Sequence, residues 1–178
     1  MRLISVKDDY INFLLQHDKN VMWNKEEKRR HTRKYLGVVF DIGGFHYFIP
    51  LSSPKSYDYK EDGSPRKSDM FCSRMTRKDR DNQIVLMGKL LYSSMIPVPS
   101  LAIQEYDIDA EEDIDYQNLI RNEYDWILLR KGEIISKSLA LYNIVVNKKF
   151  AENDLRFNKV VDFHNVEKAS YLYSSIVK

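Results

Sequence analysis

Residues 34–55 read KYLGVVFDIGGFHYFIPLSSPK, and this stretch decides the fold of the chain. Residues 35–42 and 45–51 are rich in β-branched and aromatic side chains, a composition typical of strands. Gly43 and Gly44 lie between these two runs, and glycine adopts the positive φ angles that a two-residue hairpin turn requires. The stretch therefore predicts a tight β-hairpin.

The second predicted strand leads into a polar loop, Ser52-Ser53-Pro54-Lys55, which we call the SSPK loop. Pro50 lacks an N–H group, so it fits the end or the edge of a strand. Pro54 fixes its own φ angle and favours an extended conformation for Ser53. Two hydroxyls and an ammonium group are thus held on a stiffened loop, where they can meet a phosphate. By itself such a loop is usually structural, because serine and proline are ordinary turn formers.

Two segments carry a resemblance to a known family. Residues 37–44 read GVVFDIGG and residues 47–55 read YFIPLSSPK. Together they resemble the ToxN/AbiQ family of endoribonuclease toxins from type III toxin–antitoxin systems. Further similarities follow the same order along most of the chain. They comprise Tyr10, Ile11 and Leu14 in an N-terminal helix signal, Met95-Ile96-Pro97 after a strand-like run, and Asp162-Phe163 before the last helix.

The resemblance implies a sequence-selective, metal-independent endoribonuclease. The 2′-hydroxyl of the RNA would attack the neighbouring phosphate and leave a 2′,3′-cyclic phosphate. Ser52, Ser53 and Lys55 fall on matching catalytic positions. At the Ser52 position the family more often has threonine, and serine keeps the hydroxyl. Gap-free counting back from the loop puts Arg33 where the family has an active-site lysine. A positively charged side chain is therefore retained at this position.

One position departs from the family. The same counting puts Arg29 where the family has an active-site tyrosine. Either the loop length differs here, or Arg29, Arg30 or His31 supplies the missing hydrogen-bond donor. The general base also stays open between His31, His46 and the solvent around the 2′-hydroxyl, because an unassisted serine is a poor base at neutral pH.

The family's partners are RNAs. A small repeated pseudoknot RNA acts as the antitoxin: the toxin processes it, and it blocks the active site within a closed ring-like protein–RNA assembly. Cellular and phage transcripts are the substrates, and their cleavage stops growth as a defence against phage. The resemblance implies no metal, no cofactor and no membrane.

Length and composition suit a single domain over residues 1–178, since 43% hydrophobic and 12% aromatic residues can build a core. Cys72 is the single cysteine, which suits a reducing compartment. No apolar run approaches the roughly 20 residues that span a bilayer. The N-terminus shows no signal-peptide pattern. We expect a cytoplasmic α+β protein: a twisted antiparallel sheet or partial barrel with surrounding helices.

The net charge is only +2, but it is unevenly distributed. Residues 24–34 hold six basic and two acidic residues, whereas residues 105–125 hold nine acidic residues and one arginine. This pattern fits either a basic face that binds a polyanion or ordinary solvated loops. The candidate RNA-binding residues are Trp23, Lys28, Arg29, Arg30, His31, Lys34, Lys148 and Lys149.

The remaining elements follow from hydrophobic patterns. We expect a strand at residues 2–6, then a helix capped by Asp8 or Asp9. Residues 56–83 are polar and predict a long loop with a short ordered piece at 69–75. The next expected elements are strands within 84–98, two helices within 116–149 that break at Gly132, an extended segment or short strand at 159–161, and a last helix over 162–174.

Three functions remain open from the sequence. The first is the endoribonuclease toxin, the second a non-cleaving RNA-binding protein on the same scaffold, and the third a protein-interaction module. The acidic residues 104–115 raise the alternative of a hard-metal site, but they lack the glycine-turned spacing of a calcium loop. We therefore interpret this segment as exposed and solvated.

Overall fold

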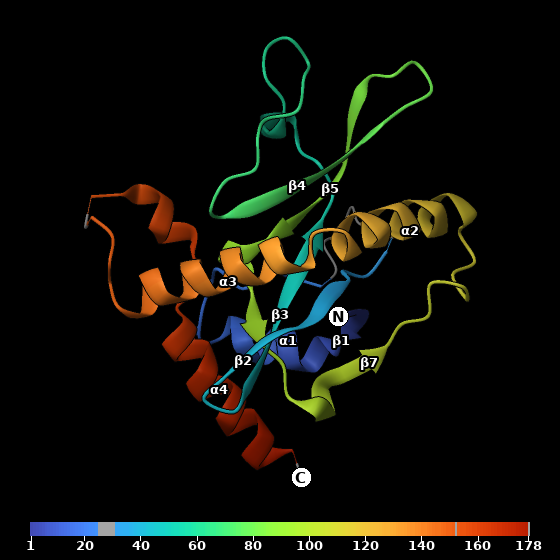
Figure 1. The fold of residues 1–178 in the computed structure, drawn as a ribbon. Helices are drawn as coiled ribbons and strands as arrows, with labels where there is room; N and C mark the ends of the chain where they lie inside the picture. Colours follow the sequence, from blue (N-terminus) through green and yellow to red (C-terminus); the bar gives the residue numbers. More distant parts are fainter. Residues whose placement is uncertain (25–30, 152, 178) are drawn as a thin grey trace.

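The computed structural model describes residues 1–24, 31–151 and 153–177. In this part of the chain, four helices surround an open antiparallel sheet of seven strands (Figure 1). The strands are β1 (Arg2–Val6), β2 (Tyr35–Ile42), β3 (Phe45–Ser52), β4 (Cys72–Lys78), β5 (Ile84–Leu91), β6 (Ile96–Pro97) and β7 (Ile103–Glu105). Their order is β4-β5-β3-β2-β1-β7, and β6 pairs with β3. The predicted α+β class is confirmed.

The hairpin at the centre of the sheet forms as predicted. Gly43 and Gly44 have φ angles of 56° and 83°, the left-handed values that a two-residue turn between β2 and β3 needs. Gly37 is required for a different reason, because a Cβ atom there would lie only 1.8 Å from the ring of Phe48. The backbone of β2 thus lies directly against the Phe48 ring.

The four helices are α1 (Asp8–Leu15), α2 (Ile114–Leu128), α3 (Lys131–Val146) and α4 (Phe163–Ile176). The predicted cap of the first helix is wrong. Lys7 occupies the N-cap position without a side-chain bond, and Asp8 and Asp9 lie in the first turn, where carboxylates favour the helix dipole. The Asp162 side chain does cap the last helix by accepting a bond from the Asn165 N–H.

The break between α2 and α3 lies at Leu129 and Arg130, not at Gly132 as predicted. Gly132 is accommodated in the first turn of α3, where no neighbouring atom crowds it. Lys159 ends the 3₁₀ helix η4 (Leu155–Lys159), and residues 160–161 follow it as extended chain. No helix in the described ranges is both long and apolar enough to cross a membrane.

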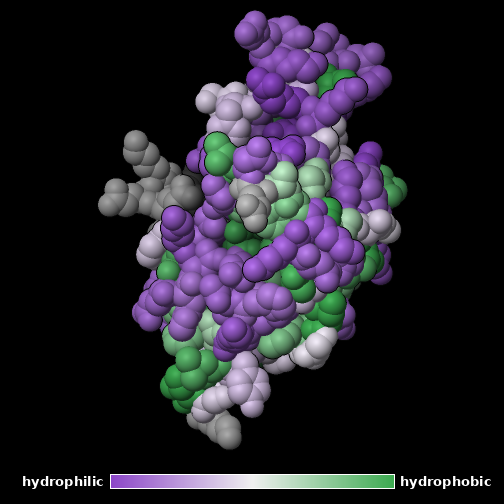
Figure 2. Space-filling view, turned by 90° about the vertical axis from the view of Figure 1, so that its left-hand side faces the viewer, coloured by the Kyte–Doolittle hydropathy of each residue, from purple (hydrophilic) through white to green (hydrophobic). Residues whose placement is uncertain are grey.

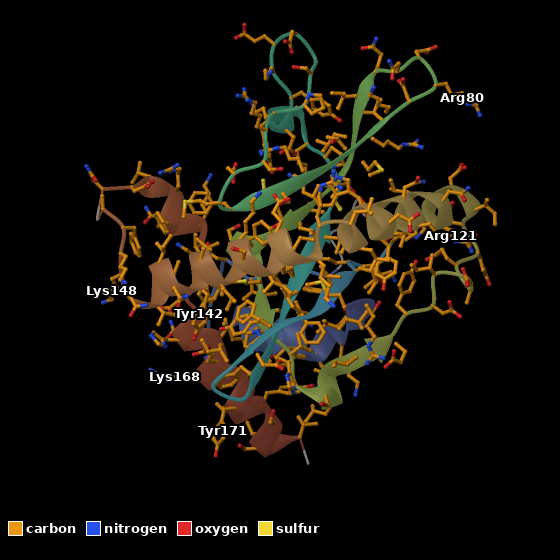
Figure 3. The ribbon with its side chains drawn as sticks, in the orientation of Figure 1. Arg80, Arg121, Tyr142, Lys148, Lys168 and Tyr171 are labelled. Carbon is orange, nitrogen blue, oxygen red and sulfur yellow. The ribbon has the colours of Figure 1, made fainter. Side chains whose placement is uncertain are left out.

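The long loop predicted for residues 56–83 is wrong over much of its length. It begins with the 3₁₀ helix η1 (Ser56–Asp58) and contains β4, which pairs with β5 along its whole length. Arg74, Arg77 and Lys78 make β4 too polar to recognise as a strand. The β4–β5 hairpin projects from the body of the protein, with Arg80 at its tip (Figure 3).

Aromatic side chains join the helices to the sheet. Tyr47 from β3 stacks on Phe40 with ring centroids 4.8 Å apart, and it meets Tyr142 and Phe163 edge-on. The hydroxyls of Tyr47 and Tyr142 both donate to Glu167 at 2.8 Å. Burial, together with this carboxylate, raises the pKa of Tyr47 far above its usual value. Both tyrosines therefore stay protonated and fasten α3 and α4 to the central hairpin.

Candidate active site

The SSPK loop opens into a groove of about 620 Å³. Its walls come from the segment after α1, the end of β3, the 3₁₀ helix η2 (Tyr92–Ser94) and η4. The described residues that line it are Lys19, Asn20, Val21, Met22, Trp23, Arg33, Ser52, Ser53, Lys55, Tyr57, Leu91, Ser93, Ser94 and Lys159. All four predicted catalytic residues, Ser52, Ser53, Lys55 and Arg33, are thus brought together.

The groove is basic although the whole chain is nearly neutral. Lys19, Arg33, Lys55 and Lys159 contribute four cations to the part of the lining that the structure describes, and no carboxylate lies among those residues. The groove walls concentrate positive potential at one place, as a polyanion site requires. The uneven charge of the sequence therefore does build a basic surface.

A buried ion cluster lies beneath the loop. The carboxylate of Asp58 in η1 is fully buried and meets Lys89 Nζ at 2.6 Å and Arg74 Nη2 at 3.1 Å. It also accepts a hydrogen bond from the backbone N–H of Lys55 at 2.9 Å. Burial by itself raises the pKa of Asp58, but the bonds from Lys89 and the Lys55 N–H and the two positive charges outweigh it and lower the pKa. Asp58 therefore stays charged and holds the loop on β4 and β5.

Arg33 fastens the other side of the loop. Its side chain is 2% exposed, and it donates from Nε to the carbonyl of Trp23 at 3.0 Å and from Nη1 to the carbonyl of Leu51 at 2.8 Å. These bonds tie the segment that carries Trp23 to the end of β3, one residue before Ser52. Arg33 thus lines the groove and also sets the position of the loop.

The two serines of the loop differ in exposure. Ser52 is buried at the end of β3, opposite Lys89 of β5, and its Oγ donates to the carbonyl of Ser53 at 3.3 Å. Ser53 and Lys55 are exposed on the groove side. A phosphate in the groove therefore meets Ser53 and Lys55 first, with Ser52 behind them.

Two exposed aromatic rings line the groove. Trp23 was predicted to bind RNA and is 54% exposed, whereas Tyr57 was not predicted and is 66% exposed. Lys89 Nζ lies 4.8 Å from the centroid of the Tyr57 ring, so the buried ion cluster also supports this tyrosine. The clue to Tyr57 was its place only two residues after Lys55.

Lys19 and Lys159 were missed because they are far apart in the sequence. The Asn20 side chain donates to the carbonyls of Asn158 and Val160, at 3.1 and 2.9 Å, and so brings the two segments together. The backbone N–H of Asp162 donates to the Asp18 carboxylate at 2.6 Å and strengthens this junction. Nothing local in either segment signals the pairing.

Several predicted RNA-binding residues do not line this groove. His31 stacks on Tyr116 with ring centroids 3.8 Å apart, and its Nε2 lies 3.2 Å from Asp113. Lys34 Nζ lies 3.8 Å from the centroid of the Tyr106 ring. Lys148 and Lys149 follow the end of α3, where Figure 3 shows Lys148 at the outer edge of the molecule. Lys28, Arg29 and Arg30 lie outside the described residues.

The acidic segment takes part in ordinary pairing. Glu105 pairs with Arg2 at 2.9 Å, and Asp109 pairs with Arg121 at 2.5 Å. In the described ranges, no group of three or more histidine, cysteine, aspartate or glutamate side chains is arranged to hold a metal ion.

A family model described as "Toxin ToxN, type III toxin-antitoxin system" matches residues 2–171. The chain belongs to the ToxN family. The endoribonuclease ToxN of Bacillus thuringiensis subsp. kurstaki is 30% identical over 173 residues, which cover 95% of this chain and 82% of that protein. The predicted family is thus confirmed.

Solved structures agree with this assignment. One, from a study of selective toxin inhibition by a non-coding RNA pseudoknot in bacterial type III systems, has a TM-score of 0.78 and 27% identity, with 97% of this chain and 96% of that chain covered. Another is AbiQ, a lactococcal anti-phage endoribonuclease of a type III toxin–antitoxin system. Its TM-score is 0.76 at 25% identity, and 98% of each chain is covered. The ToxN-family fold thus extends over nearly the whole chain.

Proposed function

We propose that this chain is an endoribonuclease toxin that cleaves RNA strands bound in the groove. The observation that carries the proposal is the exposed pair Ser53 and Lys55, held on a firmly anchored loop inside a basic groove. The ToxN and AbiQ relatives are named endoribonucleases, which supports the same activity here. The groove fits a single strand, because its cations match the phosphates and its exposed rings match unstacked bases.

The chemistry requires no metal, because RNA supplies its own nucleophile. The 2′-oxygen attacks the adjacent phosphorus, the bond from phosphorus to the 5′-oxygen breaks, and a 2′,3′-cyclic phosphate and a 5′-hydroxyl result. Lys55 stabilises the negative charge that grows on the phosphoryl oxygens. Ser53 donates a hydrogen bond to the phosphate or, through water, to the leaving 5′-oxygen. Holding the strand for in-line attack supplies the rest of the acceleration.

Ser52 and Arg33 are buried in the groove wall, farther from the reacting phosphate than Ser53 and Lys55. Ser52 sets the Ser53 backbone through its hydroxyl, and Arg33 adds positive charge while it holds the end of β3. Among the described residues, no histidine lines the groove. We therefore propose that water, and neither His31 nor His46, accepts the 2′ proton.

The partner of this toxin is a small repeated pseudoknot RNA, which the toxin processes from its precursor and which then fills the groove and blocks cleavage. The similar structure obtained in work on toxin inhibition by an RNA pseudoknot supports this partner. We propose a closed ring-like assembly of alternating protein and RNA. Lys28, Arg29, Arg30, His31, Lys34, Lys148 and Lys149 would contact the RNA. Of these, His31, Lys34, Lys148 and Lys149 lie outside the groove lining.

The toxin would act in the cytoplasm on cellular and phage transcripts. The AbiQ relative is described as an anti-phage enzyme, which supports a role in abortive infection. Cys72 fits a reducing compartment as a buried free thiol, whose pKa burial raises to about 11.

The test is RNA cleavage in the presence of EDTA, with the 3′ ends of the products analysed. Wild-type protein should cut and leave cyclic phosphate, whereas Ser53→Ala should cut at least tenfold more slowly, since it removes one donor to the reacting group. Ser56→Ala is the matched control, because Ser56 is exposed in the next turn but does not line the groove. Cleavage that stops in EDTA, or equal rates for Ser53→Ala and wild type, would contradict the proposal.

One observation favours a non-cleaving RNA-binding protein instead. Arg33 stands at the family's lysine position, but it is buried and donates to two backbone carbonyls. If this alternative holds, the purified chain carries a small RNA and yet leaves long transcripts intact in the same assay.

A further inference from the structure

A second cavity adjoins the groove. It has a volume of about 500 Å³ and is lined by Phe71, Ser93, Leu155, Arg156 and Lys159. We call it the side pocket. Ser93 and Lys159 line both cavities, so the side pocket continues directly from the groove. Lys159 therefore lies where a ligand that spans both cavities would pass.

The wall of the side pocket is held firmly. The backbone N–H of Ser93 donates to the carbonyl of Phe71 at 3.1 Å, and the N–H of Val161 donates to the carbonyl of Ser93 at 2.9 Å. Phe157 meets the Phe71 ring edge-on, with centroids 5.3 Å apart. These contacts join the start of β4, η2 and the end of η4 into one preformed surface.

The lining has the chemistry of a base-binding site. Leu155 is 72% exposed although it is a large apolar residue. Asp154 holds the Arg156 guanidinium through two bonds, Nε to Oδ1 at 2.9 Å and Nη2 to Oδ2 at 2.6 Å. The Arg156 Cζ lies 5.5 Å from the centroid of the Phe71 ring. A fixed planar cation and apolar side chains bind unstacked nucleobases.

The surface near η4 combines apolar and hydrophilic regions (Figure 2). The side of the molecule that carries η4, on the left in Figure 1, faces the viewer in Figure 2. Apolar surface is exposed there in a hollow between hydrophilic regions (Figure 2). The neighbouring cation Lys159 matches a phosphate, which favours a nucleotide as the occupant over a purely apolar ligand.

We propose that the side pocket binds an unpaired base next to the scissile phosphate and so selects the RNA sequence that is cut. This inference rests on the proposed endoribonuclease function and adds the site that gives it selectivity. The base belongs either to a transcript being cleaved or to the antitoxin RNA, since both present the same chemistry.

The test uses a pool of RNA oligonucleotides with randomised positions on both sides of the cleavage site. Wild type and the double variant Leu155→Ala/Arg156→Ala are compared by sequencing their products. The double variant should lose about tenfold of the preference at one flanking position, since the bound base loses the side chains on which it stacks. A second arm titrates both proteins with the RNA that co-purifies with wild type. Changed preference on the pool assigns the base to a cleaved transcript, and weakened affinity in the second arm assigns it to the antitoxin.

The control is Leu129→Ala, which alters another highly exposed leucine at the end of α2, away from both cavities. The variants should keep the wild-type unfolding temperature, because the altered side chains are exposed. Unchanged preference and unchanged affinity in the double variant would overturn the side-pocket assignment alone. A wild-type protein that cuts no RNA would overturn the proposed function and the selection of a cleavage sequence, and the affinity arm would then decide whether the side pocket binds a base.

Discussion

Two sets of cations surround the SSPK loop, and they differ in burial. Arg33, Arg74 and Lys89 are buried or nearly so, and each donates to a carboxylate or a backbone carbonyl. Lys19, Lys55 and Lys159 are exposed and face the groove. The buried set positions the loop, and the exposed set meets the RNA. Around this loop, therefore, the burial of a cationic side chain indicates whether it positions the loop or contacts the RNA.

The largest effect is expected beneath the loop. Asp58→Asn removes the carboxylate that lies between Lys89 and Arg74. The buried Lys89 ammonium loses its carboxylate partner, while Arg74 keeps its ion pair with Asp69 at 3.3 Å. Breaking a buried pair in this way costs about 3–5 kcal/mol of the free energy of unfolding. Urea unfolding followed by circular dichroism measures the loss. Glu61→Gln, in the same loop but exposed, serves as control and should leave the stability unchanged. An Asp58→Asn protein as stable as wild type would remove the distinction between the two sets.

Lys55→Met should give the opposite result. Its ammonium group is exposed in the groove, so the unfolding midpoint should stay at the wild-type value. Cleavage should fall by about a hundredfold, the usual effect of removing one group that stabilises developing charge. Single-turnover rates measure this, with Lys60→Met as the control from the same surface loop. Wild-type cleavage by Lys55→Met would refute the role of the exposed set.

The pH dependence of stability sharpens the comparison. Because the folded protein lowers the pKa of Asp58, its contribution to stability is complete above the ordinary aspartate pKa of about 3.9 and is lost as the pH falls through the lower folded value. The difference in unfolding free energy between wild type and Asp58→Asn should therefore shrink under strong acid. Chemical unfolding across an acidic pH series measures it. A difference in unfolding free energy that widened on acidification would contradict this prediction.

The smallest effect is expected for a single exposed cation. Lys159→Gln should weaken RNA binding a few-fold and reduce the slope of log affinity against log salt by about one, since one phosphate contact is lost. Fluorescence anisotropy across a salt series gives that slope. Lys168→Gln is the control, because Lys168 is exposed on α4 and does not line the groove (Figure 3). Equal slopes for the two variants would show that Lys159 does not contact phosphate.

The sequence predicted the parts of the site that are local. The hairpin, its glycine turn and the SSPK loop lie in one stretch of 22 residues, where side-chain pattern and turn chemistry agree. Arg33 was predicted to line the site, and it does, but its burial and its bonds to two carbonyls depend on the folded chain.

The parts that the sequence missed depend on tertiary contacts. The strand β4 is too polar to recognise alone and becomes a strand because it pairs with β5. Lys19 and Lys159 line the same groove because the Asn20 side chain bonds the carbonyls of Asn158 and Val160, far along the sequence. In the sequence, Asp58 does not differ from other loop residues, and its role follows from the fold, which places Arg74 and Lys89 beside it.

The most direct test of the groove is photo-crosslinking. An RNA with 2′-deoxyribose at its mapped cleavage position cannot supply the nucleophile, so it stays intact on wild-type protein. With 4-thiouridine beside that position, irradiation and mass spectrometry locate the contacting residues. We predict crosslinks at Trp23 and Tyr57, the two exposed rings of the groove. Crosslinks confined to the Gly43–Gly44 turn and to the acidic residues 105–115 would contradict it.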